Sequence, residues 1–181
     1  SRRIATFQHD ARGVGHMHLV SSAVGHPELD SWRYPLPEDT VIFRIHRVVL
    51  DVEAPEGQRV VRLQMPPDQH RSTVCDHIVC GGGWADIEWT PDAERLVFVS
   101  SSRDHKVATV RVADAATGAV RDVFTERVPT FFESGANWRV LPETDELLWY
   151  SAHRTGRGHL YLFDLRTGAL KNAVTSGDWA V

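Results

Sequence analysis

Short β-type segments separated by turns run along most of the chain. The clearest set, residues 84–126, contains four of them. Ile87 and Trp89 alternate with acidic residues in the first segment, RLVFV at 95–99 is apolar on both faces, and the last segment is the most polar. A strand that is apolar on both faces is typical of burial between two neighbouring layers. The pattern predicts a four-stranded sheet that is buried at its second strand and half-exposed at its outer edge.

A degenerate copy of this unit follows at 137–178. DAATG at 114–118 becomes DLRTG at 164–168, and RLVFVSS at 95–101 aligns with LLWYSAH at 147–153. Four strands per unit and a period of about fifty residues are typical of β-propeller blades. We therefore predict an all-β fold, a partial β-propeller of about three four-stranded antiparallel blades.

Residues 1–66 form a less regular first blade in this interpretation, and the chain is a single partial domain. SRRIATFQHD at 1–10 corresponds to the second strand of a blade, and VIFRIHRVVLDV at 41–52 is a long β-branched strand. QRVVRLQMP at 58–66 is its expected hairpin partner. A crossover at 66–73 then leads to the second blade.

Residues 11–40 have no counterpart in the other two units. They contain a short strand-like stretch at 16–22, followed by the sequence WRYPLP at 32–37. Proline forces an extended backbone and removes a donor from the strand ladder. We interpret this stretch as an insertion on the rim of the first blade.

The same turn chemistry occurs once in each unit. EAPEG at 53–57, DAATG at 114–118 and DLRTG at 164–168 each place an acidic residue four positions before a glycine. A short acidic side chain can accept hydrogen bonds from amides of its own loop, and glycine adopts the positive φ that closes a hairpin. We therefore expect Glu53 to act in its turn as Asp114 and Asp164 act in theirs.

Charge and hydropathy exclude two classes of partner. The net charge is −4 and no Lys/Arg cluster occurs, which argues against nucleic acid because basic patches supply most of that affinity. The apolar runs are too short to span a bilayer. The chain opens with SRRIATF and stops in GDWAV, so we expect it to be part of a longer protein. The sequence does not assign a compartment.

Three groups of residues could suggest metal, redox or phosphate chemistry, but no metal or cofactor is predicted. His16 and His18 share one face of a strand, but the sequence offers no third ligand. Cys75 and Cys80 fit free thiols, a local disulfide or, together with His77, a metal or redox site. Gly81 to Gly83 lack the Lys-Ser/Thr of a phosphate loop and indicate a flexible entry loop.

Other polar groups fit turns better than catalysis. Ser100 to Ser102 lack the Gly-x-Ser-x-Gly context of a nucleophile elbow. The acidic residues near the inner strands are expected to be solvated loop charges: Asp92, Glu94, Asp145 and Glu146. No catalytic residue is therefore predicted in this chain.

The segment PTFFESGANW at 129–138 is the strongest candidate for a site. Phe131 and Phe132 are adjacent and cannot both point to the same side of a strand. One of them, together with Glu133, would face the axial channel or a partner domain. The alternative is that both aromatics belong to the core between two blades.

Several phrases resemble the N-terminal propeller of dipeptidyl peptidase IV-like serine peptidases, in the prolyl oligopeptidase clan. SAHRTGRGHLYLFD at 151–164 matches the family phrase S-E-R-x-G-x-x-H-L-Y, and AVTSGDWAV at 173–181 matches L-T-x-G-x-W-x-V. WADIEWTPDAERL at 84–96 is similar to a strand followed by W-S-P-D-G and R-L. SWRYPLPEDT with the strand after it resembles Y-P-x-A-G … V-x-L-x-V-V-D. The likeness spans nearly the whole chain and is weakest at 127–137.

The resemblance implies about three blades cut from an eight-bladed propeller. In the family this propeller caps an α/β-hydrolase domain, which removes N-terminal dipeptides through a Ser-Asp-His triad. A double-glutamate motif upstream in the propeller binds the free amino terminus of the substrate. Neither this motif nor the triad matches residues of this chain. The family's extended-subsite loop falls close to 129–138, which implies that Phe131, Phe132 and Glu133 lie on the peptide route. The implied partners are the hydrolase domain and peptides.

A propeller fold does not fix a function, so a non-enzymatic protein-interaction module is the alternative hypothesis. A closed propeller leaves no blade face bare, whereas three blades would expose two terminal faces and one broken blade. We therefore also expect self-association through those faces or through the edge strand at residues 1–10.

Overall fold

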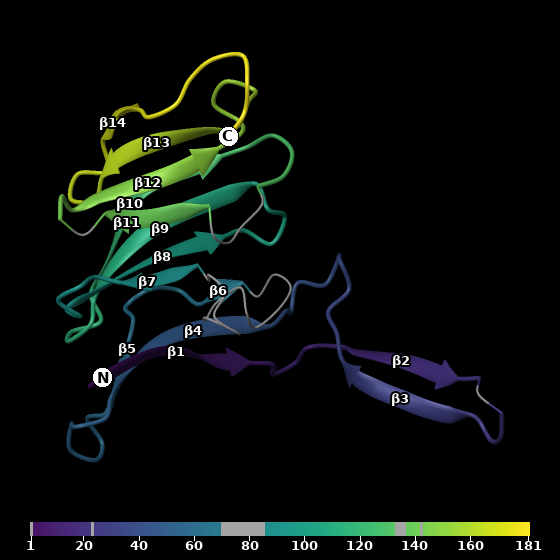
Figure 1. Ribbon diagram of the computed structural model, residues 1–181. Helices are drawn as coiled ribbons and strands as arrows, with labels where there is room; N and C mark the ends of the chain where they lie inside the picture. Colours follow the sequence, from purple (N-terminus) through teal and green to yellow (C-terminus); the bar gives the residue numbers. More distant parts are fainter. Residues whose placement is uncertain (1, 23, 70–85, 133–136, 142) are drawn as a thin grey trace.

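Strands alone make up the regular structure of the computed structural model, which describes residues 2–22, 24–69, 86–132, 137–141 and 143–181. These residues form three four-stranded antiparallel sheets and one two-stranded hairpin. The three sheets lie beside one another, in chain order from the N-terminus to the C-terminus (Figure 1). The described part of the chain contains no helix that is long and apolar enough to cross a membrane.

Each sheet is built from consecutive stretches of sequence. The first sheet contains β1 (Arg3–Asp10), β4 (Arg44–Asp51), β5 (Val60–Arg62) and β6 (Asp68–Gln69). The middle sheet contains β7 (Ile87–Trp89), β8 (Arg95–Ser101), β9 (Val107–Asp114) and β10 (Val120–Arg127). The third sheet contains β11 (Trp138–Leu141), β12 (Glu146–Ser151), β13 (His159–Asp164) and β14 (Leu170–Ala173). The last two sheets keep their strands in sequential order, as propeller blades do.

The outer strand of the first sheet is broken, which the sequence analysis did not expect. β5 pairs with the second half of β4, and β6 pairs with the first half. The prediction of one strand at 58–66 followed by a crossover at 66–73 was therefore wrong at this point. Pro66 and Pro67 have no backbone N–H and interrupt the ladder between the two pieces.

The insertion forms a hairpin of β2 (His16–Ser21) and β3 (Glu28–Arg33). We call this hairpin, together with the segment that returns from it to Asp39, the arm. It projects away from the three sheets in Figure 1. Only the first of its strands was predicted, because the second, ELDSWR, has no alternating apolar pattern. All six residues of β3 are exposed, so no core imposes such a pattern on it.

The core lies between the sheets and confirms the predicted fold class. Leu96 and Phe98 of β8 pack toward the first sheet, where they meet Val49 of β4. The alternate residues Val97 and Val99 pack toward the third sheet. β8 is thus buried on both faces, which explains why its sequence is apolar at every position from 96 to 99.

The repeat is one residue out of the expected register at its second strand. Arg95 pairs with Asp114, and Glu146 pairs with Asp164, so β12 follows β8 by 51 residues rather than 52. A shift of one residue exchanges the two faces of a strand. Trp149, and not Tyr150, is therefore the equivalent of Phe98, and both are fully buried.

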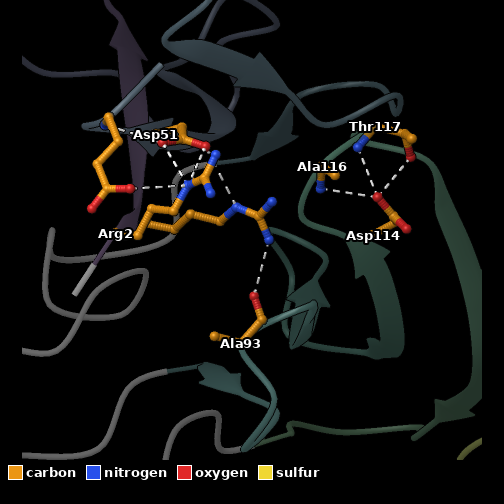
Figure 2. A network of polar contacts seen from close by, with 8 residues as sticks. Arg2, Asp51, Ala93, Asp114, Ala116 and Thr117 are labelled. Atoms are coloured by element: carbon orange, nitrogen blue, oxygen red, sulfur yellow. Dashed lines mark hydrogen bonds and ion pairs between the residues drawn. The ribbon is translucent and has the colours of Figure 1, made fainter.

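The acid–glycine turns have the predicted geometry in the last two sheets. Asp114 Oδ1 accepts hydrogen bonds from the amides of Ala116 and Thr117 and from the Thr117 hydroxyl, at 2.7–2.9 Å (Figure 2). Asp164 accepts the corresponding bonds from Thr167. Gly118 and Gly168 close these turns with φ of 76° and 75°.

The first turn differs from this pattern. There Asp51, not Glu53, accepts a hydrogen bond from a loop amide, that of Glu53, at 3.1 Å. Asp51 also pairs with Arg2 at 3.1 Å (Figure 2). The prediction for Glu53 was wrong because Asp51, the last residue of β4, already occupies the position from which a carboxylate reaches the loop amides.

The dependence of stability on acidic pH should reveal the contribution of the Asp114 and Asp164 carboxylates in these turns. The amide and hydroxyl of Thr117 hold the pKa of Asp114 below its usual range, and those of Thr167 do the same for Asp164. A lowered folded pKa stabilises the protein above the unfolded value of about 4, and this contribution is lost as the pH falls through the folded pKa.

We expect the urea midpoint to fall more steeply between about pH 5 and pH 2 in the wild type than in the Asp114→Asn/Asp164→Asn double variant. An asparagine amide oxygen still accepts the turn's hydrogen bonds but does not titrate in this range. Equal pH dependence of the two proteins would contradict the contribution assigned to these carboxylates.

Candidate functional site

The two adjacent phenylalanines lie on opposite sides of the segment that leads from β10 to β11. Phe132 is buried, and its ring stacks on Trp149 with centroids 5.5 Å apart. Phe131 is 53% exposed and stacks on His105 at 4.4 Å. Phe132 therefore belongs to the core between the sheets, whereas Phe131 faces outward. Glu133 lies outside the described residues.

The turn between β8 and β9 holds this segment in place. The Phe132 amide donates to the His105 carbonyl at 2.6 Å, and the Val128 amide donates to the Lys106 carbonyl at 2.9 Å. The turn bends sharply enough to make these contacts because His105 has a φ of 56°, a conformation uncommon for a residue with a side chain. Backbone bonds of one sheet thus fix the aromatic pair that precedes the next sheet.

A pocket of about 470 Å³ opens beside Phe131. It is lined by Phe131, Phe132, Asn137, Tyr150, Ala152, His153 and Val181. Its volume lies in the range of small-molecule and peptide side-chain sites. The structure thus brings both predicted aromatics to one pocket, together with residues that the sequence analysis had not singled out.

Close packing shapes the wall of the pocket at Tyr150. A Cβ atom on Gly158 would lie within van der Waals overlap of the Tyr150 ring and hydroxyl, so the phenol occupies the space that a side chain at 158 would fill. The Gly158 carbonyl accepts a hydrogen bond from the Val181 amide at 2.9 Å. This bond places Val181 at the pocket, beside Tyr150.

A buried carboxylate anchors the loop that carries Ala152 and His153. Glu126 of β10 is only 6% exposed and accepts hydrogen bonds from Trp149 Nε1 at 3.0 Å and from the Ser151 hydroxyl. Its Oε2 also pairs with Arg154 Nε at 3.1 Å. The Glu126 carboxylate thus accepts from several donors, and a buried charge is tolerated under this condition. Glu126 thus ties both ends of the loop that carries Ala152 and His153 to the middle sheet.

The lining offers groups that can bind a ligand. The exposed ring of Phe131 can contact an apolar or aromatic side chain, and the Tyr150 phenol and His153 imidazole can exchange hydrogen bonds with a peptide backbone. No acid, hydroxyl nucleophile and base are brought together among the described residues that line it. The arrangement can hold an apolar group beside a hydrogen-bonding one.

The other candidate groups of the sequence analysis lie elsewhere. His16 and His18 lie on the arm with ring centroids 6.3 Å apart, and His16 Nδ1 lies 3.4 Å from the Ser31 hydroxyl. Within the described residues, no group of three His, Cys, Asp or Glu side chains could hold a metal ion. Cys75, Cys80, His77 and the glycines at 81–83 lie outside the described residues.

The acidic residues expected to be solvated are in part structural. Asp92 accepts hydrogen bonds from the Thr90 hydroxyl and the Glu94 amide within its own turn. Asp145 forms an ion pair with Arg95 of the preceding sheet at 3.0 Å. Glu146 is only 7% exposed and binds Thr144 and Lys171, so the prediction of a solvated charge was wrong there. It occupies the first position of a strand and not a loop.

Comparison with known proteins assigns the chain to a family. The sequence model described as "Dipeptidyl peptidase IV (DPP IV) N-terminal region" matches residues 1–181, which is the whole chain. The chain belongs to this family. The resemblance noted from the phrases at 151–164 and 173–181 is thereby confirmed.

Two solved structures share the fold of this DPP IV N-terminal region. One is a "putative dipeptidyl aminopeptidase IV" from Bacteroides ovatus, with a TM-score of 0.73 and 21% sequence identity. The other is dipeptidyl peptidase 4 from Porphyromonas gingivalis, with a TM-score of 0.71 and 15% identity. Each match covers 99% of this chain but only 26% and 24% of the longer protein. The chain thus spans about a quarter of these relatives.

The structure explains why the two family phrases at 151–164 and 173–181 occur together. His159 is 1% exposed, and its ring nitrogens lie 3.1 Å from the Thr175 hydroxyl and 3.1 Å from the Gly177 carbonyl. Trp179 packs edge-on against the same imidazole at 5.4 Å. The motif G-H-L-Y and the motif T-S-G-D-W therefore form one contact, which fastens the last described segment of this DPP IV N-terminal region to β13.

Proposed function

We propose that this chain is the non-catalytic propeller segment of a dipeptidyl peptidase IV-like serine peptidase, and that its 181 residues form one partial propeller domain. In the longer protein it would help to admit and position peptides. A separate α/β-hydrolase domain would remove their N-terminal dipeptides. Membership in the DPP IV N-terminal region family, over residues 1–181, is the observation that carries this proposal.

The pocket beside Phe131 is the part of this chain that we propose to contact the peptide. An exposed aromatic ring that is held by stacking on His105 loses little side-chain entropy when a ligand packs against it. We propose that Phe131 contacts a peptide residue beyond the dipeptide that is removed. Phe132 and Trp149 would support it from the core, at a ring separation of 5.5 Å.

A non-enzymatic interaction module remains the alternative function. It is favoured by one observation, the apolar side chains exposed on the arm: Leu19, Val20 and Leu29 are 54%, 66% and 64% exposed. Val20 and Leu29 are direct partners across the hairpin, and exposed apolar side chains that lie together often mark a protein–protein contact. The two hypotheses differ in whether a Gly-x-Ser-x-Gly nucleophile turn follows this segment in the longer protein.

A substitution at Phe131 tests the positioning role in the longer protein. In the Phe131→Ala variant we expect KM for a pentapeptide to rise about fivefold, the equivalent of about 1 kcal/mol of aromatic contact. KM for a chromogenic dipeptide should not change, because that substrate does not reach the pocket. Leu170→Ala is the matched control, since Leu170 is an exposed apolar residue of β14, 47% exposed and not part of the pocket lining. An equal effect on both substrates would contradict the proposed role of Phe131.

A further inference from the structure

The turn at residues 102–106, which joins β8 to β9, lies between two parts of the molecule that are far apart in sequence. On one side it contacts the return of the arm, and on the other it contacts the segment that carries Phe131. We call it the connecting turn.

Arg103 makes the contacts on the arm side. Its Nη1 donates to the Asp39 carbonyl at 2.8 Å, and its Nη2 donates to the Leu36 carbonyl at 2.6 Å. The Arg103 backbone amide donates to Gln69 Oε1 at 2.9 Å. Leu36 and Asp39 are joined to each other as well, because the Leu36 amide donates to Asp39 Oδ2 at 2.7 Å. One guanidinium therefore binds a closed turn at the base of the arm.

His105 makes the contacts on the pocket side, two residues further along. Besides the backbone bond to Phe132 and the stacking on Phe131, its Nδ1 lies 3.3 Å from the Phe132 carbonyl. The ring thus touches both aromatic residues of the pocket. A displacement of His105 would carry the exposed ring of Phe131 with it.

Internal bonds make the connecting turn a stiff unit. The Ser102 hydroxyl donates to Asp104 Oδ1 and accepts from the Val107 amide at 3.0 Å. Asp104 Oδ1 also accepts from the Lys106 amide at 3.2 Å. The His105 amide closes the turn on the Ser102 carbonyl at 3.0 Å. These bonds within the turn favour its movement as a body over its deformation.

We propose that the connecting turn couples the arm to the pocket, so that a contact made on the arm changes the position and mobility of Phe131. The coupling runs from Leu36 and Asp39 through Arg103 to His105 and Phe131. Such coupling is reciprocal, so occupation of the pocket would also restrain the arm. The contacts of Arg103 and His105 support this coupling whether or not the longer protein is a peptidase.

Residue-resolved amide hydrogen exchange of the 181-residue chain tests the coupling. In the Arg103→Gln variant we expect exchange at the Val128 and Phe132 amides to become about tenfold faster, although Arg103 itself bonds the arm. Arg12→Gln is the matched control. Arg12 lies just before the arm, and its guanidinium bonds to Asp10 instead of to the connecting turn. The control should leave Val128 and Phe132 unchanged.

The reverse substitution completes the test. Phe131→Ala should accelerate exchange at the Tyr34 amide, which donates to the Gly15 carbonyl where the arm hairpin ends. If Arg103→Gln is poorly folded, Arg103→Lys serves instead, because a lysine keeps the charge but not the two-pronged donor. Faster exchange confined to the arm in the Arg103 variant, or no change at Tyr34 in the Phe131 variant, would overturn the proposal.

Discussion

The Asp68→Ala variant is expected to lose about 3–5 kcal/mol of unfolding free energy, because it leaves a buried arginine without its counter-ion. The Arg47 side chain is 3% exposed, and its Nε donates to Asp68 Oδ2 at 2.7 Å. Among the described residues, its other contacts are a hydrogen bond to the Val99 carbonyl and the Phe98 ring, 4.6 Å from the guanidinium. Neither contact supplies a negative charge, so alanine at 68 would leave the charge of Arg47 uncompensated between the first two sheets.

Two variants separate this ion pair from the other charges of the cluster. Asp68 Oδ1 also lies 3.5 Å from Arg111 Nη1, and Arg111 in turn pairs with Asp122 at 2.7 Å. The Asp122 side chain is 63% exposed. Asp122→Ala should therefore cost no more than about 1 kcal/mol. The Arg47→Met/Asp68→Leu double variant, which removes both charges, should recover most of the stability lost in Asp68→Ala. Urea denaturation at neutral pH measures all three, and a loss of less than about 1 kcal/mol for Asp68→Ala would contradict the buried-charge argument.

Replacement of Gly168 by alanine should cost about 2–5 kcal/mol, the sum of a left-handed backbone and an overlap with a neighbouring sheet. Its φ is 75°, and a Cβ at this position would overlap the Val123 carbonyl oxygen. Val123 lies at the bulge of β10, where the register shifts between Asp122 and Phe124. The acid–glycine turn of the third sheet thus packs directly on the backbone of the middle sheet.

Two other glycines provide graded controls for this effect. Gly57 has a φ of 87° with no atom within 4 Å of a Cβ, so alanine there should cost only about 1–2 kcal/mol from the backbone. Gly118, with a φ of 76°, would meet the backbone of Arg62 in the first sheet and should resemble Gly168. Equal losses at positions 57 and 168 in thermal or urea unfolding would show that contact between the sheets contributes nothing.

The turn motif was recognisable in the sequence, but its second role was not. The pattern of an acid four residues before a glycine predicted the loop hydrogen bonds of Asp114 and Asp164, which depend only on local geometry. The contact of each glycine with the previous sheet depends on how two sheets stack. No local pattern encodes that distance, so only the structure shows why a side chain is excluded at 118 and 168.

The fold followed from the repeat, whereas most of the candidate site did not. Burial on both faces imposed the continuous apolar run at 96–99, so β8 could be recognised as a strand between two layers. The arm strand β3 has no core to face and carried no such signal. At the pocket, the adjacent phenylalanines were recognised because neighbouring residues point to opposite sides. Tyr150 joins them through the register of β12, which the repeat had placed one residue off, and His153 comes from the loop after that strand.

Hydrolysis of a Gly-Pro or Ala-Pro chromogenic dipeptide tests the central claim most directly, with the full-length protein compared against the 181-residue chain. We expect the full-length protein to release the chromophore and the isolated chain not to release it. An inert full-length protein with its serine nucleophile in place would favour the interaction module. Hydrolysis by the isolated chain would contradict the account, because the chain is proposed to carry no catalytic residue.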